Sequence, residues 1–242
     1  MRKIFASDLD GTLFFKGGHK EGDFKAIKKF QEAGHLFGCC TGRTLEGALR
    51  SFDNFYDLDF YIASSGAVIC NAKKEVIYEA KVDFEIVKEI YETYKDQVNI
   101  VFQGRDYYSF RENEDGINFT HIYNLEAIRN EPLYGLCLFT EEYSILDQIE
   151  VELKEKYPQV SGHRNLGAID VVSCECSKGI ALKKVKELFN ADITYGIGDA
   201  KNDLPMIRQA DVGFTFHSSL DEVKNEADQV VDSVEEAIYS VM

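Results

Sequence analysis

Short apolar runs alternate with helical patterns of apolar residues at both ends of the chain. The runs predict buried strands, and apolar residues three or four positions apart predict helices. Before the middle of the chain, strands are expected at residues 4–7, 35–40 and 60–63, helices at 23–33 and 45–52, and a hairpin at 67–70 and 75–78. Near the end, helices are expected at 179–189, 203–209 and 234–241, and strands at 193–197 and 212–216. This alternation predicts an α/β fold: a Rossmann-like core in which helices cover both faces of a parallel sheet.

The segment between these two parts has a different rhythm. Helical patterns at residues 84–95 and 143–157 are separated by several strand patterns in place of strict alternation. The predicted strands lie at residues 99–103, 107–111, 133–139, 159–162 and 168–172. An α+β segment inside an alternating pattern indicates an inserted domain. The sequence therefore predicts a discontinuous core of residues 1–81 and 173–242 and an α+β cap domain of residues 82–172.

Composition and charge narrow the class of protein. Of the 242 residues, 45% are hydrophobic and 29% are charged, which is typical of a soluble globular protein. No apolar run is long enough to cross a bilayer, and no signal peptide precedes Asp8, so we expect a cytoplasmic protein. The six cysteines are expected to be reduced thiols. The net charge of −15 argues against nucleic acid and anionic membranes as partners.

The stretch Asp8-Leu9-Asp10-Gly11-Thr12-Leu13 is the most informative part of the sequence. Asp8 and Asp10 lie at the carboxyl end of the first predicted strand, where open α/β folds bind their ligands. Gly11 and Thr12 predict a turn whose backbone N–H groups are free to meet an anion. In phosphoryl chemistry, Asp8 would be the carboxylate nucleophile, and Asp10 would protonate the leaving oxygen and later deprotonate water.

Three further motifs follow predicted strands or begin predicted helices. They are Thr41-Gly42-Arg43, Lys178, and Gly198-Asp199-Ala200-Lys201-Asn202-Asp203. The carboxyl ends of parallel strands lie on one edge of a sheet, so these residues are expected to surround one pocket. Thr41 and Lys178 would hold phosphoryl oxygens there, and Asp199 would hold a hard cation alongside Asp8, with Asp203 as a further candidate ligand.

Each of these residues also has a simpler structural interpretation. Thr41, Asp199 and Asp203 are suited to capping the helices that follow them, and Lys178 alone would be a surface lysine. For Asp203, capping and contact with a metal or lysine stay equally open. The order of the motifs along the chain favours a catalytic site. A phosphate dianion about 4 Å from an ionised Asp8 meets repulsion on the order of 8 kcal/mol at an effective dielectric of about 20, so a divalent cation is expected.

Taken together, these motifs resemble those of the haloacid dehalogenase superfamily phosphatases, most closely the Cof-type members, over essentially the whole chain. The resemblance implies an aspartyl-phosphate on Asp8 and general acid–base catalysis by Asp10. It also implies Mg²⁺ held by Asp8, Asp199 and the backbone carbonyl of Asp10, with Asp203 nearby. It places the catalytic Thr41 and Lys178 at the phosphoryl group, with Asn202 and Asp203 supporting Lys178 and metal-bound water. The expected substrate-binding residues are Gly11, Thr12, Gly42, Arg43 and Asn202. Arg43 is equally suited to brace a carboxylate.

The resemblance also describes the cap. The Cof-type members carry their cap between the second and third motifs, which are here Thr41-Gly42-Arg43 and Lys178. Such a cap would form a roof over the pocket. One departure is Ser65, where the family commonly has Asn, so a substrate contact by that Asn does not transfer. The cap residues that are candidates for contact with the substrate are Arg105, Tyr107, Tyr108, Arg111, His163 and Arg164. Such residues more often belong to a solvated face or to the edge of a core.

The leading functional hypothesis is a Mg²⁺-dependent phosphatase for a small phosphorylated metabolite, with a sugar phosphate favoured. The presence of Asp10 favours a phosphatase over a dehalogenase, because an alkoxide leaving group needs a proton and a halide does not. One alternative is a sugar phosphomutase of the same family, in which the phosphorylated Asp8 survives until a second hydroxyl arrives. Another is a non-catalytic regulator that binds a phosphometabolite. A monomer or weak homo-oligomer is expected.

Overall fold

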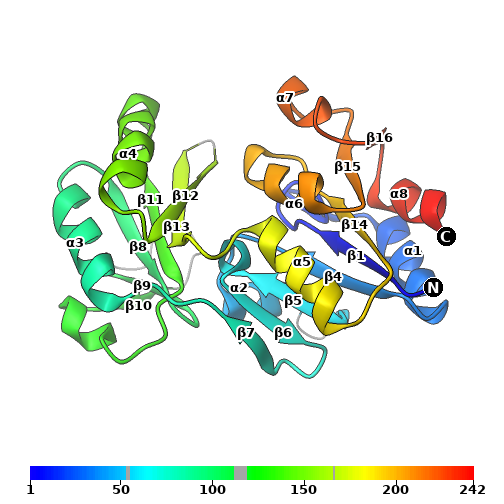
Figure 1. The fold of residues 1–242 in the computed structure, drawn as a ribbon, viewed down its shortest axis with the longest axis horizontal. Helices are drawn as coiled ribbons and strands as arrows, with labels where there is room; N and C mark the ends of the chain where they lie inside the picture. The colour runs from blue at the N-terminus through cyan, green and yellow to red at the C-terminus, as the bar shows by residue number, and fades with distance from the viewer. Residues whose placement is uncertain (53–54, 112–118, 166) are drawn as a thin grey trace.

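The computed structural model describes residues 1–52, 55–111, 119–165 and 167–242, and it contains two large β-sheets (Figure 1). The first sheet has eight strands that come from both ends of the chain, and the second has six strands from the middle. A third, small sheet consists of β2 (Phe14–Phe15) and β3 (Gly18–His19). Every helix within the described ranges is too short or too polar to cross a bilayer.

The eight-stranded sheet is parallel over most of its width. Its strands are β1 (Lys3–Ser7), β4 (Leu36–Cys40), β5 (Phe60–Ala63), β6 (Val68–Asn71), β7 (Val76–Glu79), β14 (Ile193–Ile197), β15 (Val212–Phe216) and β16 (Gln229–Val231). They are ordered β16-β15-β14-β1-β4-β5-β6-β7. Neighbours from β16 to β5 pair in parallel, and β6 and β7 add the predicted antiparallel hairpin at one edge.

Helices cover both faces of this sheet, which confirms the predicted α/β fold class. One face packs against α1 (Glu21–Glu32), α2 (Leu45–Ser51) and α8 (Val234–Val241), and the other against α5 (Lys178–Leu188) and α6 (Leu204–Gln209). On the first face the ring of Phe5 stacks on Phe37, Tyr195 and Phe214, with ring centroids 5.6, 5.7 and 5.8 Å away. Its neighbour Ile4 points to the opposite face, because side chains alternate along a strand.

Side-chain caps fix where three of the helices begin. Thr44 precedes α2, Ser177 precedes α5 and Ser233 precedes α8. Each of these side chains accepts a hydrogen bond from the backbone N–H three residues later, which satisfies a donor that the first helical turn leaves unpaired. The cap at Ser177 makes Lys178 the first residue of α5.

The six-stranded sheet is mostly antiparallel. Its strands are β8 (Asn99–Gln103), β9 (Tyr107–Ser109), β10 (Thr120–His121), β11 (Gly135–Phe139), β12 (Val160–Asn165) and β13 (Ala168–Ser173), in the order β10-β9-β8-β11-β13-β12. Helices α3 (Phe84–Tyr94) and α4 (Tyr143–Lys156) cover its outer face, away from the eight-stranded sheet (Figure 1). Its other face is therefore turned towards the first sheet.

The two sheets have separate hydrophobic cores. Residues of α3 and α4 pack with β8, β11 and β13 in one cluster, and the clusters of the eight-stranded sheet lie elsewhere. Near the crossings of the chain between the two parts, Tyr134 and Val172 pack into the core of the eight-stranded side. On this basis we propose the domain boundaries expected from the sequence: residues 1–81 with 173–242, and residues 82–172.

The sequence pattern does not predict several short elements of the structure. They are the β2–β3 hairpin, β10, β16, and the single helical turn α7 (Asp221–Lys224). Each is too short to show a hydrophobic period. The predicted helix at residues 203–209 begins as a separate 3₁₀ turn, η3 (Lys201–Asp203), before α6.

The stack around Phe5 makes a testable prediction for stability. Phe5→Ala removes a ring from the centre of the core and should lower the free energy of unfolding by about 3–5 kcal/mol. Phe15→Ala, at a ring that is 39% exposed, should cost about 1 kcal/mol or less. Urea unfolding followed by circular dichroism measures both. Equal losses in the two variants would contradict a core centred on Phe5.

Candidate active site

The predicted catalytic residues gather at one edge of the eight-stranded sheet. Asp8 directly follows β1, Thr41 directly follows β4, and Asp199 comes shortly after β14. Lys178 reaches the same edge from the start of α5 and contacts Asp8 across 170 positions of sequence. This is the edge at which open α/β folds bind their ligands.

Lys178 is buried between two carboxylates. Its Nζ donates to Oδ1 of Asp8 at 2.7 Å and to Oδ1 of Asp203 at 2.5 Å. The three side chains are 1%, 8% and 0% exposed, in the order Lys178, Asp8, Asp203. Removing one member of a buried pair leaves an uncompensated charge, so the three groups depend on one another. The arrangement holds an ammonium group directly against Asp8.

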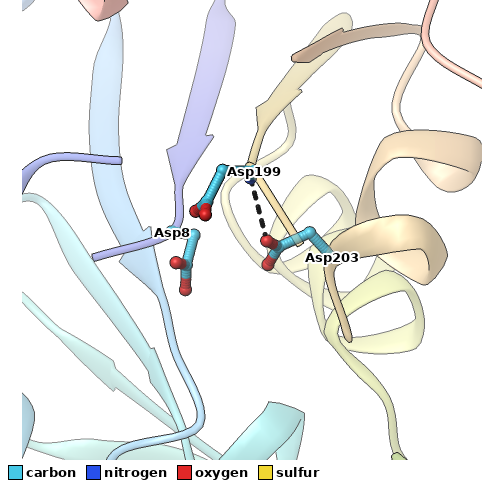
Figure 2. Close-up of side chains that lie close together, drawn as sticks. All are labelled: Asp8, Asp199 and Asp203. Atoms are coloured by element: carbon cyan, nitrogen blue, oxygen red, sulfur yellow. Dashed lines mark hydrogen bonds between the residues drawn. The ribbon is translucent and has the colours of Figure 1, made fainter. Parts of the chain in front are cut away.

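Asp8, Asp199 and Asp203 form a carboxylate cluster (Figure 2). Each offers a ligand oxygen, and the three oxygens lie within 4.8 Å of one another. Such oxygen donors suit a hard cation such as Mg²⁺. Asp203 differs from the other two, because its Oδ2 also accepts hydrogen bonds from the backbone N–H groups of Asp199 (3.1 Å) and Ala200 (3.0 Å). With both oxygens engaged, Asp203 is better placed to hold Lys178 and the Asp199 loop than to bind an ion.

Burial and neighbouring charges shift the proton affinities of this cluster. Burial, and then the charge of Asp203, raises the pKa of Asp8 to about 8, although Lys178 acts in the opposite direction. Burial also raises the pKa of Asp199. For Lys178, burial acts to lower the pKa, but Asp203 and Asp8 together raise it well above its ordinary value. An additional positive charge beside Asp8 would favour its ionised form.

The turn after Asp10 requires a glycine. Gly11 has a φ of +88°, and a Cβ at this position would lie 2.6 Å from Oδ2 of Asp199. The N–H of Gly11 donates to the Phe14 carbonyl at 2.9 Å, and the N–H of Thr12 donates to the Leu9 carbonyl at 3.3 Å. The prediction that these two N–H groups are free for an anion is therefore wrong, because the turn itself uses them.

Thr12 contributes to the site through its side chain. Its buried hydroxyl donates to Oδ1 of Asp199 at 2.8 Å. The contact links the turn after β1 to the loop after β14 and fixes the orientation of the Asp199 carboxylate.

The Thr41-Gly42-Arg43 motif lies against a carboxylate from the cap. Oγ1 of Thr41 accepts a hydrogen bond from the N–H of Arg43 at 3.1 Å, and the Thr41 side chain is buried. A Cβ at Gly42 would lie 2.7 Å from Oδ2 of Asp170 in β13. The same Asp170 oxygen accepts a hydrogen bond from Oγ of Ser65 at 3.0 Å. The glycine at position 42 thus leaves room for the cap carboxylate where it stands, and a larger residue would have to displace the end of the Asp170 side chain.

Ser65, the position at which the sequence departs from the family that its motifs resemble, has an unusual backbone. Ser64 and Ser65 have φ values of +46° and +53°, in the left-handed region that few residues other than glycine adopt. They form the 3₁₀ turn η1 (Ser64–Gly66) directly after β5. The strained turn presents the Ser65 hydroxyl to Asp170, so this serine makes a contact to the cap.

Asp10 forms an ion pair with Arg43 and its side chain lies outside the carboxylate cluster. Nε of Arg43 donates to Oδ2 of Asp10 at 2.8 Å, and Nη2 donates to Oδ1 at 2.5 Å. Nη1 of Arg43 also donates to the Ser51 hydroxyl at 2.7 Å. The Asp10 side chain is 60% exposed, so solvent or a substrate can reach it. Of the two roles that the sequence left open for Arg43, the structure shows the bracing of a carboxylate.

Asn202 lies at the boundary with the cap. Its buried Oδ1 has no hydrogen-bond partner among the described residues, and neither has Nε2 of His163 in β12. Both residues line a cavity of about 270 Å³. Burial lowers the pKa of His163, which favours a neutral imidazole. The two groups are thus available to a small polar molecule at this boundary.

The six candidate residues of the cap separate into different positions. His163 lies at the boundary, and Tyr107 faces the core, where its hydroxyl accepts a hydrogen bond from the N–H of Thr44 at 3.3 Å. The carbonyl of Arg105 accepts a hydrogen bond from Glu46 in α2. Tyr108 packs with the hydrophobic cluster of the cap, and Arg111 donates to Asn99 within the cap. Arg164 pairs with Asp147 of the cap and also lines the boundary cavity with His163 and Asn202.

Sequence reasoning missed Asp170. Besides Ser65, its carboxylate accepts a hydrogen bond from Nε2 of Gln103 at 3.3 Å, and burial raises its pKa. The available signal was an acidic residue inside the apolar run 168–172, on the strand face opposite Ile169 and Val171. An acid in such a run indicates a partner or a ligand, since an unpaired buried carboxylate is costly.

Known proteins resemble this chain over nearly its whole length. A family model of haloacid dehalogenase-like hydrolases matches residues 5–242. The chain is similar to the 5-amino-6-(5-phospho-D-ribitylamino)uracil phosphatase YwtE of Bacillus subtilis, with 26% identity over 97% of this chain and 94% of the relative.

Solved structures share the fold. One is a haloacid dehalogenase-like hydrolase from B. subtilis, with a TM-score of 0.90, 18% identity and coverage of 99% of both chains. Another is the subclass IIB sugar phosphatase BT4131, with a TM-score of 0.77, 23% identity and coverage of 98% of this chain and 96% of the other. Since the family model spans nearly the whole sequence, the chain belongs to the haloacid dehalogenase-like hydrolases, as its motifs predict.

Proposed function

We propose that this protein is a Mg²⁺-dependent phosphatase that hydrolyses a small phosphorylated metabolite through an aspartyl-phosphate on Asp8. The observation that carries the proposal is the buried Asp8 carboxylate, which is bonded to Lys178 and lies beside Asp199 at the ligand-binding edge of the sheet. A carboxylate in these surroundings is suited to attack phosphorus, because the ammonium offsets the charge that the substrate brings.

The proposed reaction has two steps. An oxygen of Asp8 attacks the phosphorus atom, the bond to the substrate's ester oxygen breaks, and Asp10 in its protonated form gives its proton to that oxygen, which leaves an Asp10 carboxylate. Water then attacks the phosphorus of the aspartyl-phosphate, with Asp10 taking its proton, and free phosphate leaves while Asp8 is restored. The exposure of Asp10 supports this role, since its carboxyl group can meet both an alcohol and water.

The remaining residues would bind and orient the phosphoryl group. Lys178 and the Thr41 hydroxyl are proposed to donate to its oxygens, and Gly42 is proposed to bind substrate through its backbone. Asn202 and Arg43 are proposed to contact the rest of the substrate at the cap boundary. Gly11 and Thr12 would act through the turn that they form and through the Thr12 contact to Asp199.

The carboxylate cluster fits a hard divalent cation. We propose that Asp8 and Asp199 hold Mg²⁺ with the backbone carbonyl of Asp10, and that Asp203 supports the site through Lys178 and the Asp199 loop. When bound, Mg²⁺ supplies positive charge that favours an ionised Asp8 and reduces the repulsion between that carboxylate and a phosphate dianion.

The proposed substrate is a phosphate monoester of a sugar or a related polyol. The relatives support this class: YwtE is a 5-amino-6-(5-phospho-D-ribitylamino)uracil phosphatase and BT4131 is a sugar phosphatase. We further propose that the protein works in the cytoplasm as a monomer or weak homo-oligomer. All six of its cysteines are unpaired thiols, which is usual in a reducing compartment.

Replacement of the nucleophile tests the proposed function. Asp8→Asn should lower phosphate release from a panel of sugar phosphates by at least about 1,000-fold, because the covalent step is lost. Asp147→Asn, at a cap carboxylate that is 71% exposed, is the control and should keep full activity. If folded Asp8→Asn releases phosphate at the wild-type rate, the proposed mechanism is wrong. Isomerised sugar phosphate in place of free phosphate would identify a mutase.

The proposed role of Asp10 as general acid can be tested by comparing two types of substrate. Asp10→Asn cannot donate a proton, so rates should fall on the order of a hundredfold or more for alkyl phosphates, and far less for aryl phosphates, whose leaving oxygen is weakly basic. The ratio of kcat/KM for the two substrate types, measured in wild type and variant, gives the answer. Equal losses for both types would exclude proton donation to the leaving group.

Metal binding is measurable without turnover. At a Mg²⁺ concentration about 100 times its Kd, the folded state gains about 2.7 kcal/mol. A chain of this size should then melt several degrees higher, at about 2–4 °C per kcal/mol. Asp199→Asn should abolish most of this rise, and Asp221→Asn, at a side chain that is 91% exposed, should retain it. An equal rise in both variants would place the cation elsewhere.

A further inference from the structure

The 3₁₀ turn η1 holds the loop that carries Thr41. The N–H of Ser65 donates to the Thr41 carbonyl at 3.0 Å. The N–H of Ser64 donates to the Arg43 carbonyl at 2.7 Å. Two adjacent N–H groups of one turn therefore bind both ends of the loop 41–43, and the position of the turn sets the position of the Thr41 hydroxyl.

The third residue of the turn packs against the segment that carries Lys178. Gly66 has a φ of +103°, and a Cβ at this position would lie 2.3 Å from the carbonyl oxygen of Ser177 and 3.1 Å from the backbone nitrogen of Lys178. The backbone of the turn thus lies directly against the start of α5. A shift of the turn would displace the peptide from which the Lys178 side chain extends to Asp8.

The cap reaches this turn through Asp170. Oγ of Ser65 donates to Oδ2 of Asp170 at 3.0 Å, and Nε2 of Gln103 in the cap donates to Oδ1 at 3.3 Å. A Cβ at Gly42 would lie 2.7 Å from the same Oδ2, so the carboxylate also lies against the loop 41–43. Asp170 is thus held within its own sheet and contacts both the turn and the loop.

The conformation of the turn depends on its surroundings. Ser64 and Ser65 both lie in the left-handed region, and residues other than glycine keep this conformation where neighbouring contacts hold it. The hydrogen bond to Asp170 is a contact that exists only while the cap is seated on the core. Loss of this bond would let the turn relax, and the turn would then move the backbone groups that hold Thr41 and Lys178.

We propose that Asp170 and Ser65 are positioning residues, whose hydrogen bond aligns Thr41 and Lys178 for catalysis when the cap is seated. This inference rests on the proposed phosphatase function and adds a way in which the cap controls the chemistry of the core. Neither residue has to touch the substrate. Because the turn acts on groups proposed to bind the phosphoryl oxygens, its effect should be the same for every phosphate ester, whatever its alcohol part.

Two substitutions break the contact from opposite sides. Ser65→Ala removes the donor, and Asp170→Ala removes the acceptor. Each should lower kcat by about 10- to 100-fold, because a small misplacement of catalytic groups is costly. The loss should be equal for p-nitrophenyl phosphate and for the fastest sugar phosphate of the panel, both measured with saturating Mg²⁺. Circular dichroism checks that each variant is folded.

A conservative variant separates the hydrogen bond from the charge. In Asp170→Asn the amide oxygen can accept from Ser65, and the new NH₂ group can donate to Oε1 of Gln103 after the Gln103 amide rotates. That Oε1 is buried and has no partner among the described residues, so it is available to accept. Asp170→Asn should therefore keep most of the wild-type kcat. A loss as large as that of Asp170→Ala would contradict a role for the bond.

The matched control is a contact between cap and core that lies away from the turn. Asp106 of the cap accepts two hydrogen bonds from Arg50 in α2, at 3.0 and 2.9 Å. Asp106→Asn removes the charge of this pair and keeps an acceptor for the N–H of Tyr107. Its kcat should stay near that of the wild type. An equal loss in Asp106→Asn and Ser65→Ala would assign the effect to seating of the cap in general and overturn the inference.

Two further results would overturn the inference while the phosphatase stands. One is a wild-type kcat in folded Ser65→Ala. The other is a loss confined to the sugar phosphate, which would indicate a direct contact with the substrate. If Ser65→Ala fails to fold, Ser65→Gly replaces it, because glycine accepts the left-handed φ and also lacks the hydroxyl. Failure of the proposed function looks different, because phosphate release would then be absent from the wild type or unchanged in Asp8→Asn.

Discussion

The position of one buried ammonium group sets the geometry of the site. Lys178 joins three segments that are far apart in sequence: β1 through Asp8, α5 through its own first turn, and the loop after β14 through Asp203. Removing one partner from such a buried arrangement typically costs about 3–5 kcal/mol, because the other charge remains uncompensated. The same contacts that hold the sheet edge together therefore hold Asp8, the proposed nucleophile, beside the ammonium group of Lys178.

The cluster nevertheless carries more negative than positive charge. Asp8, Asp199 and Asp203 lie together around one lysine, and burial raises the pKa of Asp8 and Asp199. This excess of negative charge is suited to a divalent cation, and in the proposed reaction the bound cation would let the site accept a phosphate dianion. Arg43 pairs with Asp10 outside this carboxylate cluster. The more exposed position of Asp10 suits the exchange of protons with substrate and water.

Much of the core and of the site was predictable from the sequence. Buried parallel strands read as apolar runs, so β1, β4, β5, β14 and β15 were expected, and their order placed Asp8, Thr41 and Asp199 on one edge. The turn after Asp10 was expected too, but not that its N–H groups bond within the turn, because this depends on how the chain closes on Phe14.

Contacts between the cap and the core could not be predicted in this way. Asp170 meets Ser65 and Gly42 only because the register of β13 and the left-handed turn at Ser65 bring distant segments together. The row that Asp170 forms with Cys137 and His163 across the cap sheet likewise follows from strand register, which a single sequence does not specify.

The central claim is that Asp8 becomes phosphorylated during turnover. The most direct measurement is a rapid acid quench of the protein reacting with a ³²P-labelled substrate, followed by identification of the labelled peptide. The account predicts label on the peptide that contains Asp8, released by hydroxylamine as expected of an acyl phosphate. Turnover with no labelled protein at any quench time, or label on another residue, would contradict it.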